Sequence, residues 1–375
     1  MSHDIVIYTA SSGTAGFYDR SHGRAGGAER QMTLLARALV QRGYRVAHVI
    51  YPPREPVELD YPLTLVYRAP YAGGRPVVGG LLEAAAVWRA LRRADAGVLV
   101  VRTASPLVGV AALFARVHGR RLIFSGSNVS DFTLETMSSR LNRRLYRFGV
   151  RRADVVVVQS SDQRSLALEA FPSLRRVVAI PSFAETPPVE DGREAGDAFL
   201  WFGRSVPEKQ PLRYVELARA LPEASFRMIP VPQGADTRLL GELRAAAAGL
   251  QNLELLDPLP HAQAAKLVEQ AVAVVNTSVL EGMPNTFLEA WASGVPVLTL
   301  QFDPDGTVKR HGLGISAGGS WEAFVEGARE LWRSRSDRRD LARRVRSYVE
   351  SAHSEEAVAA QWGALVDEAR KRPQP

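Results

Sequence analysis

Residues 271–300, AVAVVNTSVLEGMPNTFLEAWASGVPVLTL, decide the fold because they contain a complete strand, helix and strand. The flanking runs AVAVVNTS and PVLTL are short and largely apolar, which is typical of parallel strands buried on both faces. Between them, an apolar helical pattern follows Pro284, and proline is favoured in the first turn of a helix. The segment therefore predicts one crossover unit of a parallel sheet.

The same unit recurs along the chain. Before residue 185, the runs DIVIYTA, RVAHVIY, GVLVVR, RLIFSG and DVVVVQS alternate with longer helical patterns, and FLWFGR restarts the alternation at residue 199. A polar, Pro- and Gly-rich linker, AETPPVEDGREAGDA, lies between the two series. We expect an α/β protein with two doubly wound Rossmann-like domains, 1–185 and 197–353, that face each other across a cleft. We expect the last helix, about 354–370, to pack back on the first domain.

Composition limits the possible functions. The chain has 375 residues, 46% of them hydrophobic, and no cysteine, which excludes disulfides and thiolate metal sites. It has no basic leader and no apolar run of about 18 residues, so we expect a cytoplasmic, soluble protein.

The excess of positive over negative charge lies entirely in the first half of the chain. Residues 1–185 carry 25 arginines, no lysine and 14 acidic residues, a net +11, whereas the remainder carries −4. The densest run, RLNRRLYRFGVRR at 140–152, predicts a basic amphipathic helix. Such a helix suits an anionic lipid surface or phosphate groups, or it is an ordinary solvated face. Nucleic acid is disfavoured because the chain has no recognition motif, zinc spacing or aromatic platform.

Ligands of open α/β sheets bind beyond the carboxyl ends of the strands, so motifs that follow strands are candidate sites. After the first strand, Gly26 and Gly27 open a helix whose amides favour an anion, although an ordinary loop is an equal alternative. After FLWFGR, Arg204 and Lys209 offer a guanidinium and an ammonium, which suit a diphosphate; a surface pair without a ligand is the alternative. Lysine is rare, four residues against 43 arginines, so its place here is informative.

The helix that follows Pro284 provides a second anion site. Its first amides, near Asn285 and Thr286, face the carboxyl edge of the sheet. Glu281 precedes the helix and Glu289 lies one turn inside it, so the two carboxylates flank the anion site. They suit hydroxyl groups on either side of a diphosphate. A hydrolase's acid and nucleophile are the alternative, which the amides between the two carboxylates disfavour.

Three other features have simpler interpretations. Asp303 and Asp305 in FDPDG have the spacing of a cation site, but Asp-Pro-Asp-Gly after a strand is also a turn, which we favour. His22 and His311 are expected to be surface residues.

FLWFGRSVPEKQP (199–211) and SVLEGMPNTFLEAWASGVPVL (278–298) resemble the family 4 glycosyltransferases of the GT-B type. The pattern E-G-x-P-x-x-x-x-E-A, with two glutamates separated by seven residues, is the most specific feature. GGAERQMTLLARALVQRGYRV, ADVVVVQSSDQRSL and VVAIPSF extend the resemblance over nearly the whole chain.

The resemblance implies a retaining transfer of sugar from a nucleoside diphosphate sugar, with no metal and no other cofactor. It assigns the donor diphosphate to Arg204 and Lys209, the donor sugar to Glu281 and the ribose to Glu289. The rest of the donor site would comprise Gly203, Gly282, Met283, Pro284, Asn285 and Thr286.

The chain departs from the family after the fourth or fifth strand of its N-terminal domain. Many relatives have a histidine near the reacting sugar, whereas this chain has Gly126, Ser127 and Asn128, with Asp131 close behind. Ser127 and Asn128, together with Gly26 and Gly27, are therefore the candidates for an acceptor or phosphate loop.

We therefore expect a glycosyltransferase of cell-surface glycan or glycolipid assembly, acting on an anionic or lipid-linked acceptor, with peripheral contact at the inner membrane face. A sugar-nucleotide epimerase of the same double fold and a non-catalytic nucleotide-binding or anionic-surface-binding protein are the alternatives. Donor base, sugar, acceptor, linkage and oligomeric state are not specified by the sequence.

Overall fold

The computed structural model describes residues 1–19, 26–69, 76–133, 137, 139–186, 196–232 and 237–371. Two compact units make up the chain: unit 1 is Met1–Phe183 with the segment that begins at Glu355, and unit 2 is Ala184–Ser354. His22 and most of the linker lie outside the described residues.

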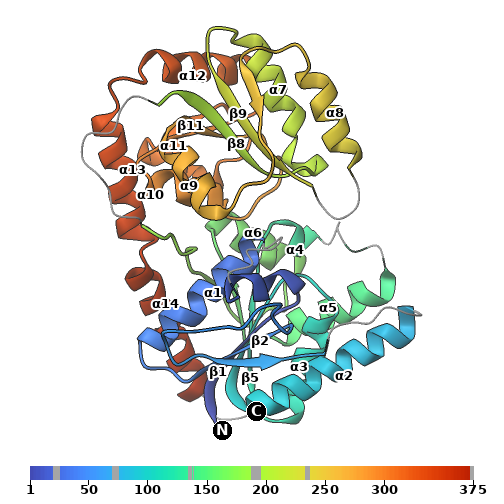
Figure 1. The fold of residues 1–375 in the computed structure, drawn as a ribbon. Coiled ribbons are helices and arrows are strands. Elements are labelled where there is room, and N and C mark those ends of the chain that lie inside the picture. Colours follow the sequence, from blue (N-terminus) through green and yellow to red (C-terminus); the bar gives the residue numbers. More distant parts are fainter. Residues whose placement is uncertain are drawn as a thin grey trace. The chain divides into compact units, whose positions relative to one another are not determined.

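Unit 1 contains a seven-stranded, parallel sheet (Figure 1). The strand order is β3-β2-β1-β4-β5-β6-β7, and β1 and β4 pair with Ile5 opposite Val98. The strands are β1 (His3–Thr9), β2 (Val46–Ile50), β3 (Thr64–Tyr67), β4 (Ala96–Arg102), β5 (Arg121–Ser125), β6 (Val155–Val158) and β7 (Val177–Ala179).

Helices cover both faces of this sheet. One face packs against α2 (Pro76–Ala94), α3 (Leu107–Val117), α5 (Arg140–Arg152) and α6 (Ser161–Ala170), and the other against α1 (Gly27–Gln41) and α14 (Glu355–Lys371). Two short helices, Ser12–Phe17 and α4 (Ser130–Thr133), follow β1 and β5. Because α14 buries Val358, Trp362 and Val366 in the core beside α1, the last helix of the chain belongs to unit 1.

Unit 2 contains a six-stranded parallel sheet in the order β10-β9-β8-β11-β12-β13. Its strands are β8 (Ala198–Arg204), β9 (Phe226–Val231), β10 (Leu253–Leu255), β11 (Ala271–Asn276), β12 (Val297–Thr299) and β13 (Gly314–Ser316). Its α-helices are α7 (Pro211–Ala220), α8 (Arg238–Ala247), α9 (His261–Glu269), α10 (Asn285–Ala292), α11 (Thr307–His311), α12 (Trp321–Arg333) and α13 (Arg339–Ala352). Two 3-10 helices, Pro207–Lys209 and Pro304–Gly306, lie in its loops.

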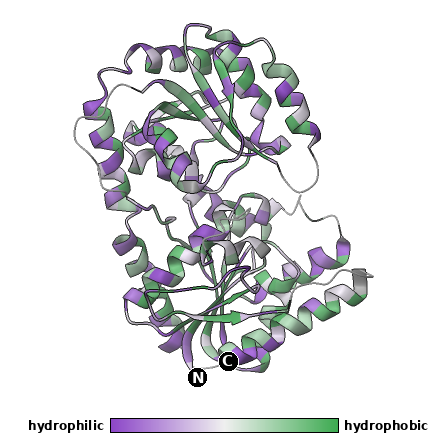
Figure 2. Ribbon diagram, viewed as in Figure 1, coloured by the Kyte–Doolittle hydropathy of each residue, from purple (hydrophilic) through white to green (hydrophobic). Residues whose placement is uncertain are grey.

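Hydropathy follows the layers of each unit. Figure 2 shows predominantly apolar strands, whereas the helices mix apolar and polar residues. Strands such as β11 and β6 are buried along their whole length, which explains why continuous apolar runs predicted them. The predicted α/β class with two doubly wound Rossmann-like sheets is confirmed. Within the described ranges, no helix combines the length and apolar content that a bilayer crossing requires.

Each sheet reverses its strand order once. The reversal lies between β1 and β4 in unit 1 and between β8 and β11 in unit 2. At such a point the loops from the two neighbouring strands leave in opposite directions, which opens a crevice at the carboxyl edge. The reversal in unit 2 therefore selects the loops after β8 and β11 as the place for a ligand.

Unit 1 buries a histidine whose pKa is far below the usual value. His48 on β2 is fully buried, and its Nδ1 lies 2.6 Å from the Tyr18 hydroxyl. Its Nε2 has no hydrogen-bond partner in the described part of the chain. Burial lowers the pKa of His48 to about 3, because the imidazolium would lose its hydration.

We predict that protonation of His48 contributes to acid unfolding. An unfolded histidine titrates near pH 6.5, so the native state binds this proton more weakly and stability falls as the pH drops from about 6.5 toward 3. The slope is about 1.4 kcal/mol per pH unit. Between about pH 6.5 and 5, His48→Asn should therefore lose ~2 kcal/mol less stability than the wild type in urea unfolding. Equal losses would contradict the assignment.

Candidate functional site

The loop after β8 is short and conformationally restricted. Arg204 ends β8, the 3-10 helix Pro207–Lys209 follows, and Gln210 takes a left-handed conformation (φ 43°) before α7. Pro211 is the first residue of α7, where its fixed φ suits a helix start. This sharp turn places Lys209 at the carboxyl edge of the sheet.

Lys209 meets Glu281 there. The Lys209 Nζ donates to Glu281 Oε1, and the Ser278 hydroxyl donates to the same oxygen at 2.7 Å. The side chains of Lys209 and Glu281 are about 20% and 11% exposed, so the ion pair is largely shielded from water. The motif after β8 and the motif after β11 thus join at the reversal of strand order.

Buried hydrogen bonds fix the two loops to each other. Thr277, which is fully buried, donates its hydroxyl to the Lys209 carbonyl at 2.7 Å and accepts from Trp201 Nε1 at 3.1 Å. The Val279 amide donates to the Glu208 carbonyl at 2.9 Å. A Cβ on Gly203 would lie 3.5 Å from Lys209 Cδ, so the lysine stem runs along the β8 backbone.

Sequence reasoning did not single out Trp201, Thr277 and Ser278. Thr277 and Ser278 directly follow β11, and this position was the available signal. Thr277 bonds to Trp201 and Lys209, which lie 76 and 68 residues away, and spacing does not reveal such a link. Ser278 lies only three residues before Glu281.

Helix α10 begins where the sequence predicted. Pro284 is its N-cap, and the first backbone bond runs from the Phe287 amide to the Pro284 carbonyl at 3.0 Å. Thr286 lies one residue before Phe287, so its amide comes before the first hydrogen bond of the helix. Trp291 anchors the helix because it is fully buried and donates Nε1 to the Leu313 carbonyl at 3.0 Å.

The remaining donor-site candidates surround this helix start. Gly282, Met283 and Pro284 are buried, whereas Asn285 and Glu289 are partly exposed in α10. Arg204 is exposed at the end of β8, and its guanidinium has no ion-pair partner among the residues that the structure describes. The structure therefore brings Lys209 and Glu281 into contact and places Arg204 on the same edge of the sheet.

Within the described ranges, hydrogen bonds reach one oxygen of Glu281. Oε1 accepts from Lys209 and Ser278, while Oε2 has no partner in the described ranges. A held carboxylate with one available oxygen can accept a hydrogen bond from a hydroxyl group, and the lysine beside it can bind an anionic oxygen.

In unit 1, the helix start at Gly26 and Gly27 is occupied by a carboxylate. Gly26 is the N-cap of α1, and a Cβ there would lie 2.6 Å from Glu29 Oε2. The Glu29 side chain therefore turns back over the start of its own helix, which its dipole favours. An external anion at this position would have to displace Glu29.

The amides of Ser127 and Asn128 are also engaged. They donate to Asp131 at 2.5 and 3.2 Å, and the Ser127 hydroxyl donates to the same oxygen at 2.9 Å. Burial raises the pKa of Asp131, while these hydrogen bonds and the charge of Arg102 act in the opposite direction. The segment that lacks the family's histidine is thus organised around a buried carboxyl group.

Arg102 is the buried cation of this region, and sequence reasoning missed it. It ends β4 beside the reversal in unit 1, and its Nη1 donates to the Ser125 hydroxyl at 2.8 Å. Burial lowers the pKa of Arg102 to about 10, although Asp131 and Glu29 oppose the shift. The run GVLVVR does not reveal that Arg102 is buried, because a charged residue after an apolar run indicates only that the strand ends there.

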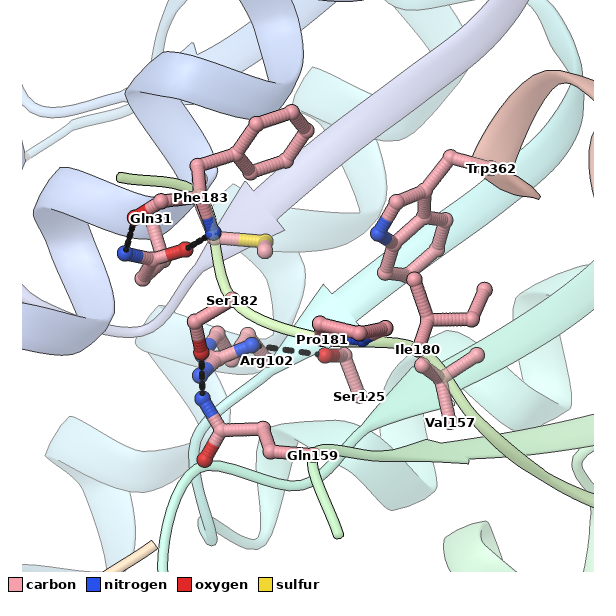
Figure 3. A pocket seen from close by; sticks show the side chains of 11 residues that line it. Gln31, Arg102, Ser125, Val157, Gln159, Ile180, Pro181, Ser182, Phe183 and Trp362 are labelled. Carbon is pink, nitrogen blue, oxygen red and sulfur yellow. Dashed lines mark hydrogen bonds between the residues drawn. The ribbon is translucent and has the colours of Figure 1, made fainter. Parts of the chain in front are cut away.

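A small cavity lies beside Arg102 (Figure 3). Its volume is about 10 Å³, enough for one water molecule and too small for a sugar. Gln31 closes one side by a reciprocal pair of bonds to the Phe183 backbone, at 2.8 and 2.7 Å. These bonds hold Phe183 against α1, and the cavity itself is too small to be a substrate site.

The FDPDG segment is a turn. Asp303 accepts from the amides of Val308 and Lys309 at 2.8 and 3.2 Å, so its carboxylate caps α11. No three metal-ligating His, Asp or Glu side chains gather anywhere in the described ranges. His311 is exposed at the end of α11 and packs against the ring of Tyr348, as expected of a surface residue.

Two family models match successive parts of the chain. The Glycosyl transferase 4-like domain matches residues 26–182, and the Glycosyl transferases group 1 domain matches residues 196–334. The chain is a family 4 glycosyltransferase of the GT-B type. The resemblance drawn from the two motifs is therefore confirmed.

Solved structures support the same fold for this glycosyltransferase. Sucrose-phosphate synthase from Thermosynechococcus elongatus matches with a TM-score of 0.78 at 16% identity, over 97% of this chain and 98% of that chain. HepE from Anabaena, solved with UDP, matches with a TM-score of 0.72 at 15% identity, over 97% and 100%. TarM matches with a TM-score of 0.62 at 14% identity, over 76% of this chain and 58% of TarM.

We predict that Lys209→Ala lowers sugar transfer by about a hundredfold or more, since removal of one preorganised donor to a developing anion has that effect. The melting temperature should stay within a few degrees of the wild type. Lys266→Ala is the matched control, because Lys266 is an exposed lysine of the same unit on α9. Near-wild-type transfer by Lys209→Ala would contradict the site.

We predict that Thr277→Val weakens donor binding indirectly, through the position of Lys209. The valine has a similar shape but leaves the Trp201 indole N–H and the Lys209 carbonyl without their buried partner, at a cost of about 1–3 kcal/mol for each group. We expect a lower melting temperature and a raised KM for the donor. Thr277→Ser keeps the hydroxyl and should restore both values; if the serine variant were as impaired as the valine variant, the hydroxyl would not be the cause.

Proposed function

We propose that this glycosyltransferase transfers a sugar, with retention of configuration, from a nucleoside diphosphate sugar to an acceptor hydroxyl. The observation that carries the proposal is the contact between Lys209 and Glu281 at the strand reversal of unit 2. A cation for the diphosphate and a carboxylate for the sugar hydroxyls are joined there, and HepE, which has the same fold, was solved with UDP and with UDP-glucose.

The chain's own groups account for the chemistry of the leaving group. Cleavage of the bond between sugar and phosphate builds negative charge on the departing diphosphate. Lys209, Arg204 and the first amides of α10 offer positive charge and N–H groups at the same edge of the sheet, so the developing charge is stabilised without a metal ion. Ser278 and Lys209 hold Glu281 Oε1, which leaves Oε2 to accept from a sugar hydroxyl. We assign Glu289 to the ribose.

The acceptor belongs to the basic half of the chain. Residues 1–185 carry a net +11, which favours an anionic or lipid-phosphate-linked acceptor. We therefore place the enzyme in the assembly of cell-surface glycan or glycolipid, with peripheral contact at the inner membrane face.

A thermal-shift screen of nucleoside diphosphate sugars tests the donor class, because a ligand that binds the folded state raises its melting temperature. A UDP-, GDP- or ADP-linked sugar should raise the melting temperature, and NMR of the product should show the anomeric configuration of the donor. A product of inverted configuration would contradict the retaining mechanism. No shift with any donor would contradict the proposed function.

We predict that chelation leaves transfer unchanged, because protein cations take the place of a metal at the diphosphate. The initial rate in excess EDTA should match the rate with EDTA that has been saturated with Ca²⁺. A rate that falls in EDTA and returns on addition of Mg²⁺ would show a metal requirement.

A further inference from the structure

Large apolar side chains are exposed on the surface of unit 1. Among the described residues, every large apolar side chain that is more than about a third exposed belongs to unit 1. Eight of them lie on three helices: Val78, Leu81 and Leu82 on α2, Leu113 and Val117 on α3, and Leu141, Leu145 and Phe148 on α5. Exposed apolar side chains that gather on one side of a protein, with polar residues around them, mark a binding surface.

The three helices cover the same face of the unit 1 sheet. Their inward residues, among them Val87 of α2, Ala111 of α3 and Tyr146 of α5, belong to one core, whereas α1 and α14 pack in the core on the other face. Helix α3 packs against both α2 and α5 (Figure 1). Side chains that point away from the sheet on these helices therefore share one side of unit 1.

The orientation of α5 is fixed by two glycines. A Cβ on Gly109 of α3 would lie 2.5 Å from the Leu145 carbonyl oxygen, and one on Gly149 of α5 would lie 2.5 Å from the Val108 carbonyl carbon. Because the helix backbones touch at this crossing, α5 cannot rotate to bury Leu141, Leu145 and Phe148. Their exposures are 62, 39 and 38%.

Six arginines and no acidic residue accompany these side chains on α5. Within the described part of the chain, none of the six forms an ion pair; Arg147 lies over the Phe171 ring and Arg152 over the Phe148 ring. A hollow of about 310 Å³ on α5 is lined by Arg144, Arg147, Phe148, Arg151 and Arg152. Guanidinium groups bind phosphate oxygens in a bidentate manner, so this hollow suits phosphate groups.

We propose that the face formed by α2, α3 and α5 docks on an anionic phospholipid bilayer. Arginines and apolar residues share one helix, so the leucines can enter the boundary of the acyl chains while the guanidinium groups remain among the lipid phosphates. The inference rests on the proposed lipid-linked acceptor, and it goes beyond it because it names the surface that meets the membrane.

Vesicle co-sedimentation of the full chain tests the proposal. The protein should bind vesicles that contain phosphatidylglycerol and phosphatidylcholine, and bind vesicles of phosphatidylcholine alone far more weakly. Binding should fall about tenfold or more in about 1 M NaCl, where the screening length is about 3 Å.

Charge variants locate the surface. Arg140, Arg144 and Arg151 are exposed on α5, and each basic residue near an anionic surface contributes about fivefold to partitioning, so R140Q/R144Q/R151Q should bind about a hundredfold more weakly. The matched control R244Q/R333Q/R339Q removes three exposed arginines of unit 2 and should bind like the wild type. L141Q/L145Q should also weaken binding while it preserves every charge.

Several results would overturn the proposal: no binding to anionic vesicles, equal binding to neutral vesicles, or equal loss in the two arginine triples. A dimer in light scattering that L141Q/L145Q dissociates, together with absent vesicle binding, would assign the face to a second copy of the chain. The melting-temperature shifts of the α5 variants with the donor that stabilises the wild type should equal the wild type's. Vesicle binding without any donor shift would contradict the proposed function alone.

Discussion

The contact of Lys209 with Glu281 is the interaction on which the proposed donor site depends. It joins the loops after β8 and β11, which the strand order places side by side at the reversal of the unit 2 sheet. Thr277 holds Lys209 in place, because its hydroxyl donates to the Lys209 carbonyl and accepts from the Trp201 indole N–H. The ion pair is therefore held before any ligand arrives, and a preorganised cation stabilises a developing diphosphate without further rearrangement.

Much of the fold could be predicted because the strands are buried on both faces and form continuous apolar runs. The start of α10 was also predictable, since Pro284 fixes it. The buried polar contacts were not: Thr277, Arg102 and Asp131 act through partners distant in sequence, or through burial that a single residue letter does not reveal. Glu29 shows the same limit, because an apparent anion site at Gly26 is already occupied by the chain's own carboxylate.

The two units differ in how their charged residues are distributed. Unit 2 carries the paired lysine and glutamate and little net charge, whereas the first 185 residues carry a large excess of arginine. On α5 these arginines lie without ion-pair partners in the described ranges and beside exposed leucines, while Arg102 is buried near Asp131. Similar residues thus have different physical roles: buried charge organises a loop, and exposed charge suits an anionic partner.

Calorimetric titration with the nucleoside diphosphate and the nucleoside monophosphate of the donor base measures the claimed cation site most directly, because the two ligands differ by one phosphate. The account predicts that wild-type protein binds the diphosphate at least about tenfold more tightly than the monophosphate, since an ammonium near a second phosphate contributes on the order of 1.4 kcal/mol. The preference should shrink by about tenfold when Lys209 is replaced by alanine. An undiminished preference for the diphosphate in that variant would contradict the assignment of Lys209 to the diphosphate.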